Sequence, residues 1–438
     1  MGFKELAHVF PDFTRINTQG CLVLGGVSAT DLVLDYGTPL YVFCEKTLRG
    51  RCRSFKNAFT SRYPNSEILY ASKAYIGPKV ARIFDEEGLG LDIVSGGELA
   101  VARTVNFPPA KIFFHGNNKT ADELQAALEY GVGRIVVDSI YELELLDRLA
   151  AGRGIIQPIL LRLTPGVDPH THSHTTTGVL DSKFGIPITT GQAGTAVELA
   201  VNSGNLDLMG LHFHLGSPIF ELEPYVTAIG VVLQFASEQR PHGLNLQELS
   251  PGGGFAIPYT RSQRAPSPNE YAEVIVGAVQ TGCESYGLPI PKLILEPGRA
   301  IIGPAGVALY SVGSIKSIPG MRTYAAVDGG MGDNIRPALY NAEYEAVVAN
   351  KMLEEPKNTY TIAGKFCESG DILVNKAVLP ELLSGDIIAL PASGAYNTSM
   401  ASNYNLNPRP PIVMVNDSTA TLVRRRETYE DLLNSDIL

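Results

Sequence analysis

Short apolar segments rich in β-forming residues alternate with helical segments through the first 300 residues. Parallel strands are usually joined by a helix, so this alternation predicts a parallel sheet. Eight parallel strands are the number that closes a (β/α)8 TIM-type barrel, so we predict an α/β fold of this type. The alternative is a doubly wound open sheet. The predicted strands are 68–73, 91–95, 112–115, 135–138, 159–163, 208–214, 246–250 and 293–296, and helical spacing marks 78–87, 98–103, 121–130 and 141–151.

The pattern changes after about residue 305, where turn residues rather than helices separate the apolar segments. This change predicts a second, all-β domain, which the N-terminal strands before residue 45 would join. The expected domains are therefore 1–45, 46–305 and 306–438. The predicted strands of the second domain are 307–312, 324–327, 346–349, 360–363, 386–390 and 412–415.

Composition excludes several classes of protein. The chain has 438 residues, 45% of them hydrophobic, and a net charge of −10, so a folded core is expected and disorder is not. An acidic chain without a run of Lys or Arg is a poor nucleic-acid or anionic-membrane binder. Five cysteines without CxxC spacing argue against a disulfide framework. No long apolar stretch or signal segment is evident, so a cytoplasmic protein is expected.

Polar residues gather at the predicted carboxyl ends of the barrel strands, where the active sites of such barrels lie. A lysine, two histidines, a glycine run and a glutamate converging on one face indicate an active-site mouth. The residues are Lys73, Asp92, Ser95, His115, Asn117, Asn118, Arg162, His212, His214, the run Gly252–Gly254, Glu296 and Arg299.

Each of these features has an ordinary alternative. Lys73 could be a solvated strand end, or a desolvated amine that acts as a nucleophile. Gly252–Gly254 could be a flexible turn, or a cradle whose bare N–H groups approach a phosphate. Glu296 could pair with a protonated heterocycle, and Arg299 could bind an anion. No Walker or GxGxxG motif accompanies them, so no nucleotide is indicated.

Five histidines invite a metal-site interpretation, which we disfavour. Alternate positions share a strand face, so His212 and His214 could act together. However, His170, His172 and His174 lie among Thr and Pro in a loop, and no carboxylate ligand motif accompanies them. No metal is therefore expected.

The remaining set suits pyridoxal 5′-phosphate, which needs a Schiff-base lysine, a phosphate cradle and an acid for the pyridine nitrogen. Nearly the whole chain resembles the diaminopimelate decarboxylases, which are barrel-type enzymes of alanine racemase-like fold type III, related to ornithine decarboxylase. The motifs that carry the resemblance are Gly37-Thr-Pro-Leu-Tyr41, Tyr70-Ala-Ser-Lys73-Ala, Asp92-Ile-Val-Ser-Gly-Gly-Glu98, His115-Gly-Asn-Asn-Lys119, Lys183-Phe-Gly185, His212-Phe-His-Leu-Gly-Ser217, Gly252-Gly-Gly254, Glu296-Pro-Gly-Arg299, Arg336-Pro-Ala-Leu-Tyr340, Cys367-Glu-Ser-Gly-Asp371, Gly394-Ala-Tyr396 and Tyr404-Asn-Leu-Asn-Pro-Arg-Pro410.

The resemblance implies a role for each matching residue. Lys73 would be the Schiff-base lysine, His214 would stack on the ring, and Glu296 would pair with the pyridine nitrogen. Cys367 would donate the proton, and Cys367 and Glu368 would come from the partner subunit of a homodimer. Phosphate or other cofactor contacts would come from Asp92, Ser217, Gly253, Gly254, Gly298, Arg299 and Tyr396, and substrate contacts from Arg299, Arg336, Tyr340, Glu368 and Tyr396.

The implied reaction is decarboxylation of meso-2,6-diaminopimelate to L-lysine, the last step of lysine biosynthesis. Guanidiniums at Arg299 and Arg336 suit a second carboxylate on the substrate. The alternative substrate is another, D-configured basic amino acid, while a racemase, a barrel metal hydrolase and a non-catalytic cofactor carrier are less favoured. Tyr75 and Pro218 depart from the residues common in the family, without replacing a proposed catalytic group.

Overall fold

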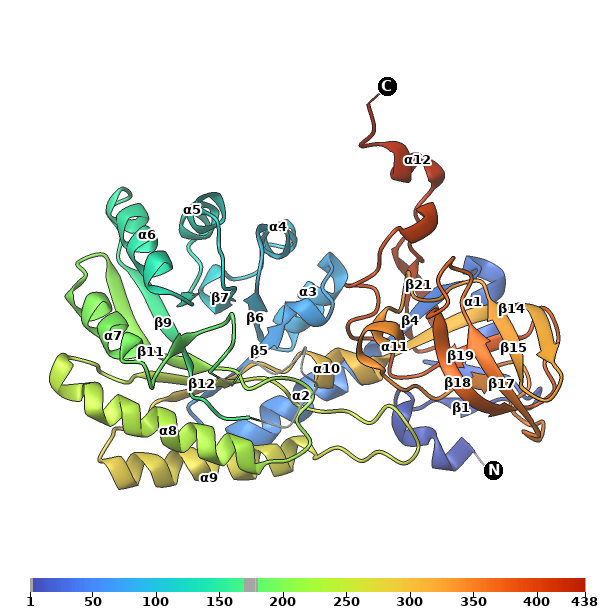
Figure 1. Ribbon diagram of the computed structural model, residues 1–438, viewed down its shortest axis with the longest axis horizontal. Helices are drawn as coiled ribbons and strands as arrows, with labels where there is room; N and C mark the ends of the chain where they lie inside the picture. The colour runs from blue at the N-terminus through green and yellow to red at the C-terminus, as the bar shows by residue number, and fades with distance from the viewer. Residues whose placement is uncertain (1–2, 169–177, 179, 438) are drawn as a thin grey trace. The chain divides into compact units, whose positions relative to one another are not determined.

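The computed structural model describes residues 3–168, 178 and 180–437 (Figure 1). These residues form two compact units. The barrel unit comprises residues 52–256 and 265–298, and the β unit comprises 1–51, 257–264 and 299–438. Segments 46–51, 257–264 and 299–305 thus belong by their contacts to the β unit, although all three fall within the range expected for the barrel. His170, His172 and His174 lie outside the described residues.

The barrel unit contains a closed sheet of eight parallel strands. Strand β13 pairs with β5, and β8 pairs with β9, so the sheet has no open edge along this path. The doubly wound open sheet is therefore excluded. A short extra strand, β10 (Ile186–Pro187), pairs with β9. The barrel strands are β5 (Ser66–Ala71), β6 (Gly90–Ile93), β7 (Ile112–Phe114), β8 (Arg134–Val137), β9 (Gln157–Thr164), β11 (Leu206–Phe213), β12 (Glu248–Gly252) and β13 (Lys292–Leu295).

Helices follow the barrel strands and pack outside them, as Figure 1 shows for α3 to α9. Several begin at side-chain caps that the sequence supplies: Thr120 and Glu123 form a capping box on α5, as Ser267 and Glu270 do on α9. These caps fix where each helix begins. The helices that follow barrel strands are α3 (Pro78–Glu86), α4 (Gly96–Thr104), α5 (Ala121–Tyr130), α6 (Ile140–Ala151), α7 (Gln192–Asn202), α8 (Glu223–Gln239) and α9 (Pro268–Tyr286), and α2 (Glu45–Thr60) comes between β4 and β5.

Apolar side chains from several strands pack into a buried cluster. Leu69, Phe113, Val136, Leu160 and Ile294 form it, and each is at most 2% exposed. An ion pair at 2.8 Å joins Arg134 and Glu248, the first residues of β8 and β12. This pair lies at the amino ends of the two strands, opposite to the carboxyl ends at which the active sites of such barrels lie.

The β unit is built on a mixed sheet of nine strands. Strand β4 pairs antiparallel with β14 and parallel with β20, so this N-terminal strand lies within the sheet of the β unit. Strands β1 (Arg15–Ile16), β2 (Leu22–Leu24) and β3 (Val27–Ser28) form a separate small sheet. The nine strands are β4 (Leu40–Cys44), β14 (Gly306–Ile318), β15 (Arg322–Val327), β16 (Val347–Val348), β17 (Asn358–Ala363), β18 (Ile372–Leu379), β19 (Ile387–Leu390), β20 (Ile412–Asn416) and β21 (Thr419–Arg424).

The β unit contains elements that the sequence did not predict. Strand β18 mixes buried and exposed residues, and β21 has no buried residue, so neither shows a continuous buried run. Short helices also occur: α1 (Ala29–Tyr36), α10 (Arg299–Ile302), α11 (Arg336–Tyr340) and α12 (Tyr429–Leu433).

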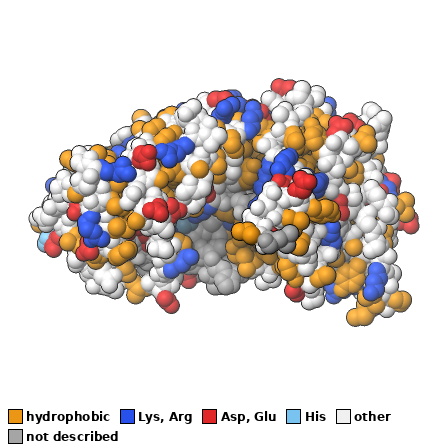
Figure 2. Space-filling model, turned by 90° about the horizontal axis from the view of Figure 1, so that it is seen from above, with side chains coloured by type: hydrophobic (Ala, Val, Ile, Leu, Met, Phe, Trp, Pro, Cys, Tyr) orange, Lys and Arg blue, Asp and Glu red, His pale blue; other side chains and the backbone are white. Residues whose placement is uncertain are grey.

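On the face seen in Figure 2, acidic, basic and apolar side chains are intermingled. Among the described residues, no helix is both long and apolar enough to cross a membrane.

Candidate active site

Glu296 lies at the centre of a buried polar cluster at the mouth of the barrel. Its Oε1 accepts a hydrogen bond from Ser250 Oγ at 2.8 Å, and its Oε2 lies 3.1 Å from His212 Nε2. Burial alone would raise the pKa of Glu296, but His212 and His115 and these hydrogen bonds hold it below its ordinary value. Glu296 is therefore an ionised carboxylate at neutral pH, and His212 Nε2 donates to it.

Asp92 and His115 bring unsatisfied polar atoms to the same cluster. His115 Nε2 lies 3.5 Å from Glu296 Oε1 and 3.7 Å from Asp92 Oδ1, and neither His115 Nε2 nor Asp92 Oδ1 has a hydrogen-bond partner among the described residues. Burial and the neighbouring Glu296 raise the pKa of Asp92, and burial lowers that of His115. Buried polar atoms without partners are costly, and they point to a site built for a ligand.

The glycine run lies against His214 and the segment that contains Ser217. Gly253 N donates to His214 Nδ1 at 3.2 Å, and Ile219 N donates to Gly254 O at 2.8 Å. A Cβ added at Gly253 would lie 2.2 Å from Glu296 O, so no side chain fits there. The close packing and the φ of +102° at Gly254 favour a built cradle over a flexible turn.

Lys73 lies just beyond the end of β5, in a short 3-10 turn (Ser72–Ala74). Its side chain is exposed, so the alternative of a desolvated amine is not observed. Its positive charge acts on nearby carboxyl groups: burial raises the pKa of Glu98 to about 7, and Lys73 opposes that shift. A Cβ added at Gly298 would lie 2.9 Å from Ala71 O, which places Gly298 beside the segment that carries Lys73.

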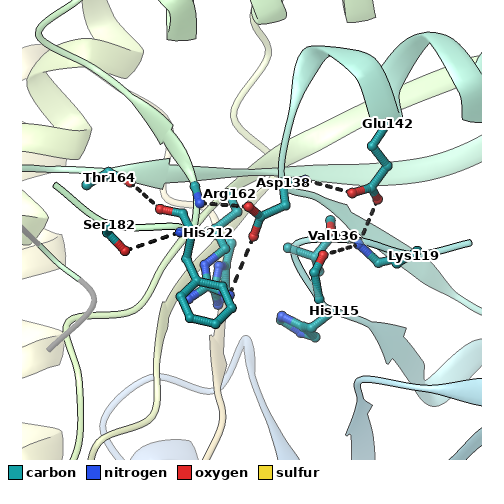
Figure 3. A network of polar contacts seen from close by, with 12 residues as sticks. His115, Lys119, Val136, Asp138, Glu142, Arg162, Thr164, Ser182 and His212 are labelled. Carbon is teal, nitrogen blue, oxygen red and sulfur yellow. Dashed lines mark hydrogen bonds and ion pairs between the residues drawn. The ribbon is translucent and has the colours of Figure 1, made fainter. Parts of the chain in front are cut away.

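A chain of buried charges lies beside this mouth (Figure 3). Lys119 Nζ donates to Gly116 O and Val136 O at 2.8 Å and to Glu142 Oε1 at 2.7 Å. Glu142 in turn accepts from Asp138 N at 3.3 Å. Asp138 Oδ2 faces Arg162 Nη1 at 3.7 Å, so two cations and two anions make up the chain.

Removing one partner of the Lys119–Glu142 pair should be costly, because the side chains are only 1% and 4% exposed. We expect Glu142→Ala to lower the free energy of unfolding by about 3–5 kcal/mol, since Lys119 keeps a buried, unpaired charge. Urea unfolding measures this loss. Glu355→Ala breaks an exposed pair with Lys357 and should cost no more than about 1 kcal/mol. Equal losses in the two variants would contradict this interpretation.

The β unit contains a second cluster, which we call the two-arginine cluster: Arg299, Arg336, Tyr259, Tyr344 and Tyr396. Arg336 is 5% exposed and donates to Tyr344 OH, and Arg299 Nη1 donates to Tyr259 OH at 2.7 Å. The Arg299 guanidinium lies over the Tyr396 ring at 4.7 Å, and Tyr396 has a φ of 61°, in the strained left-handed region. Two buried cations held by tyrosines could bind an anionic group.

Cys367 and Glu368 are exposed on a loop of the β unit between β17 and β18. The loop is anchored by Asp371, which accepts hydrogen bonds from Phe366 N at 2.9 Å and Met331 N at 2.6 Å. The other four cysteines are buried and none forms a disulfide. The loop thus presents a free thiol and a carboxylate outward. Elsewhere in the unit, Tyr340 ends α11 and is half-buried.

The structure adds three site residues that the sequence did not mark, Ser250, Tyr259 and Tyr344, and a contact for His212, which the sequence did mark. Ser250 and His212 bind Glu296, and the strand-end position that marked His212 could have marked Ser250 as well. No sequence pattern marked Tyr259 or Tyr344 as a site residue. Tyr259 lies in the loop after β12, and Tyr344 lies just before the short strand β16.

Part of the barrel mouth could instead bind a metal ion. His115, His212 and Glu296 each offer a ligand atom, and these atoms all lie within 4.8 Å of one another. Imidazole and carboxylate groups at such distances could hold a divalent ion by geometry alone. The geometry of these three side chains therefore leaves two candidate chemistries, a metal and pyridoxal 5′-phosphate.

Comparison with known proteins decides between these chemistries. Residues 45–303 match the family model of the pyridoxal-dependent decarboxylase, pyridoxal binding domain. A diaminopimelate decarboxylase of Bacillus subtilis is 47% identical over 97% of each chain. The chain belongs to the diaminopimelate decarboxylase family. Another member, from Synechocystis, is 45% identical over 98% of this chain and 93% of that protein.

Solved structures agree with membership of the diaminopimelate decarboxylase family. The diaminopimelate decarboxylase of M. jannaschii in complex with L-lysine has a TM-score of 0.92 and 33% identity, with 98% of each chain covered. A lysine/ornithine decarboxylase of Vibrio vulnificus in complex with putrescine is more distant, with a TM-score of 0.76, 25% identity, and 89% of this chain and 97% of that chain covered.

The mouth of the barrel fits pyridoxal 5′-phosphate. Glu296 could accept a hydrogen bond from a protonated ring nitrogen, and His214 and the packed glycines could provide a ring contact and a phosphate cradle. The orphaned Asp92 Oδ1 and His115 Nε2 add polar atoms for a ligand to engage. A pyridoxal-binding domain accounts for this set of donors better than a metal does.

Proposed function

We propose that this protein decarboxylates meso-2,6-diaminopimelate at its D-configured centre, giving L-lysine and CO2. The observation that carries the proposal is the two-arginine cluster. Arg336 is buried and pairs with no carboxylate among the described residues, and its Nε has no hydrogen-bond partner there. A buried guanidinium without a carboxylate partner is stabilised when it binds an anionic group. The distal carboxylate of meso-2,6-diaminopimelate is such a group.

The barrel mouth would hold the cofactor. Lys73 would form the covalent bond, Glu296 would keep a proton on the ring nitrogen, and His214 would stack on the ring. The phosphate would contact Ser217, Gly253, Gly254, Gly298 and Tyr396, and Asp92 and Arg299 would make further cofactor contacts. When bound, the pyridoxal group withdraws electrons from the bond that releases CO2. The negative charge of Glu296 is buried and held in place before the substrate binds, so the side chain does not need to move or reorient during the reaction.

The β unit would select the substrate. Arg299, Arg336 and Tyr340 would bind its distal carboxylate, with Tyr396 beside them, and Glu368 would bind its distal ammonium. Opposite charges near one stereocentre match a diamino diacid. Cys367 would donate a proton to the carbon that lost CO2, and its exposed thiol leaves it able to do so.

Cys367 and Glu368 would act in the active site of a partner subunit, making the protein a homodimer with shared sites. Their exposure on an anchored loop supports this arrangement. We further propose that residues 46–305 are the cofactor-binding domain, joined by 1–45 and 306–438, and that the protein works in the cytoplasm without nucleic-acid partners.

Substrate comparison tests the proposal. The protein with added pyridoxal 5′-phosphate should release CO2 from meso-diaminopimelate with a kcat/KM at least about 100-fold above those for D-lysine and D-ornithine, since a charge-paired carboxylate contributes several kcal/mol. Chiral chromatography should identify the product as L-lysine. Preference for either basic amino acid would favour the alternative function, a D-basic amino acid decarboxylase.

A further inference from the structure

Tyr259 contacts both guanidiniums of the two-arginine cluster. Its hydroxyl accepts a hydrogen bond from Arg299 Nη1 at 2.7 Å, while the face of its ring lies 4.5 Å from Arg336 Cζ. The face of an aromatic ring carries a negative quadrupole, so the ring attracts the cation that lies over it. Tyr259 therefore stabilises two like charges in one small region, where they would otherwise repel each other.

The electrostatics of Tyr259 agree with this geometry. Burial would raise the pKa of its hydroxyl, but the neighbouring Arg299 and Arg336 lower it below the ordinary value. The hydroxyl oxygen thus lies in a strongly positive field, in which it acts as an acceptor.

Tyr344 supports the ring of Tyr259 from the side. The two rings pack edge to face, with centroids 5.4 Å apart and planes at 80°. Tyr344 OH accepts a hydrogen bond from Arg336 Nη1 and lies 3.4 Å from Asn397 Oδ1. The rotation of Arg336 is therefore restricted by one tyrosine ring and by a second tyrosine's hydroxyl.

The backbone around Tyr259 is also fixed within the β unit. Tyr259 N donates to Gln263 Oε1 at 2.8 Å, and Tyr259 O accepts from Glu345 N at 3.3 Å. Arg261 pairs with Glu345 through both its Nε and Nη2, at 3.0 and 2.7 Å. The segment that carries Tyr259 is thereby bound to the residue next to Tyr344, so the position of the ring is set by more than its own packing.

From these contacts we propose that Tyr259 is a specificity-determining positioning residue, which holds Arg299 and Arg336 at the spacing that binds a substrate's second carboxylate. The inference rests on the proposed function and deepens it. A planar carboxylate needs donors in a fixed arrangement, and a shift of a guanidinium weakens such paired hydrogen bonds. Loss of Tyr259 should therefore weaken binding of ligands with this carboxylate and spare ligands that lack it.

Competitive inhibition by two ligands, one with the second carboxylate and one without it, tests this difference in binding. L-lysine, the product of the proposed reaction, carries the distal carboxylate, and cadaverine is the same molecule without it. Y259L removes the ring and should raise the inhibition constant of L-lysine at least about tenfold, as expected for lost cation–π and charged hydrogen-bond contacts. Y259F removes only the hydroxyl and should raise it about threefold to tenfold. The constant for cadaverine should change by less than about twofold in both variants.

Tyr360→Phe is the matched control, because Tyr360 is a buried tyrosine of the β unit whose hydroxyl accepts from Leu382 N at 3.2 Å, away from the arginines. It should leave both inhibition constants unchanged. If Y259L does not fold, Y259F alone decides the question. Equal increases for L-lysine and cadaverine, or none for L-lysine, would overturn the role of Tyr259. A wild-type protein that binds cadaverine as tightly as L-lysine would overturn the proposed function as well.

Discussion

Lys73→Ala should reduce the rate of decarboxylation by at least about 10⁴-fold, because loss of a covalent catalytic group removes most of an enzyme's chemical acceleration. Lys73 lies directly after β5, where a short turn presents its exposed amine beside the buried carboxyl groups of Asp92 and Glu98. Release of CO2 from meso-diaminopimelate measures the effect.

Lys79→Ala provides the control for Lys73→Ala. Lys79 is an exposed lysine on α3, so its loss should leave the rate within about twofold of the wild type, as for most surface substitutions. A Lys73→Ala protein that keeps a tenth of the wild-type activity would show that another group carries the chemistry.

Glu296→Gln should lower kcat by about 10²- to 10³-fold, the loss typical of removing one preorganised electrostatic contact. Glutamine keeps the size of the side chain and can still accept from Ser250, but it carries no charge to hold a proton on the ring nitrogen. The loss should therefore appear in kcat rather than in the KM of the substrate. Steady-state kinetics at saturating cofactor measures both constants.

The control for Glu296→Gln is another buried glutamate of the same barrel. Glu248 pairs with Arg134 at the first residue of β12, the end of that strand opposite to the mouth. Glu248→Gln should lower the stability of the fold with little change in kcat. If Glu248→Gln and Glu296→Gln reduced kcat equally, the effect of Glu296 would be structural.

Most of the barrel could be predicted from the sequence, because strand and helix periodicities are local properties of the chain. All eight predicted strands overlap a strand of the closed barrel, and the predicted helix 121–130 coincides with α5, where Thr120 and Gly131 cap the ends. The barrel mouth followed from the same pattern, since parallel strands bring their carboxyl ends to one face.

The two-arginine cluster, some strands of the β unit and the partners of Glu296 depend on contacts between segments that are distant in sequence. No local sequence pattern encodes such contacts. Tyr259 follows β12 in sequence, yet it packs against Tyr344 in the β unit. Strand β21 pairs with β20 and has no buried residue, while exposed Asn375 and Lys376 interrupt the apolar residues of β18, so neither segment shows a regular strand pattern. The partners of Glu296 likewise come from two other strands, and only the fold reveals which donors reach it.

We propose that the mouth of this barrel binds pyridoxal 5′-phosphate on Lys73. The most direct test is to load the protein with the cofactor, reduce it with borohydride, digest it and map the modified lysine by mass spectrometry. We predict a yellow protein whose colour is bleached on reduction and a pyridoxyl group on the peptide that contains Lys73. A colourless protein that does not respond to the cofactor, or a label confined to another lysine, would show that Lys73 does not hold the cofactor.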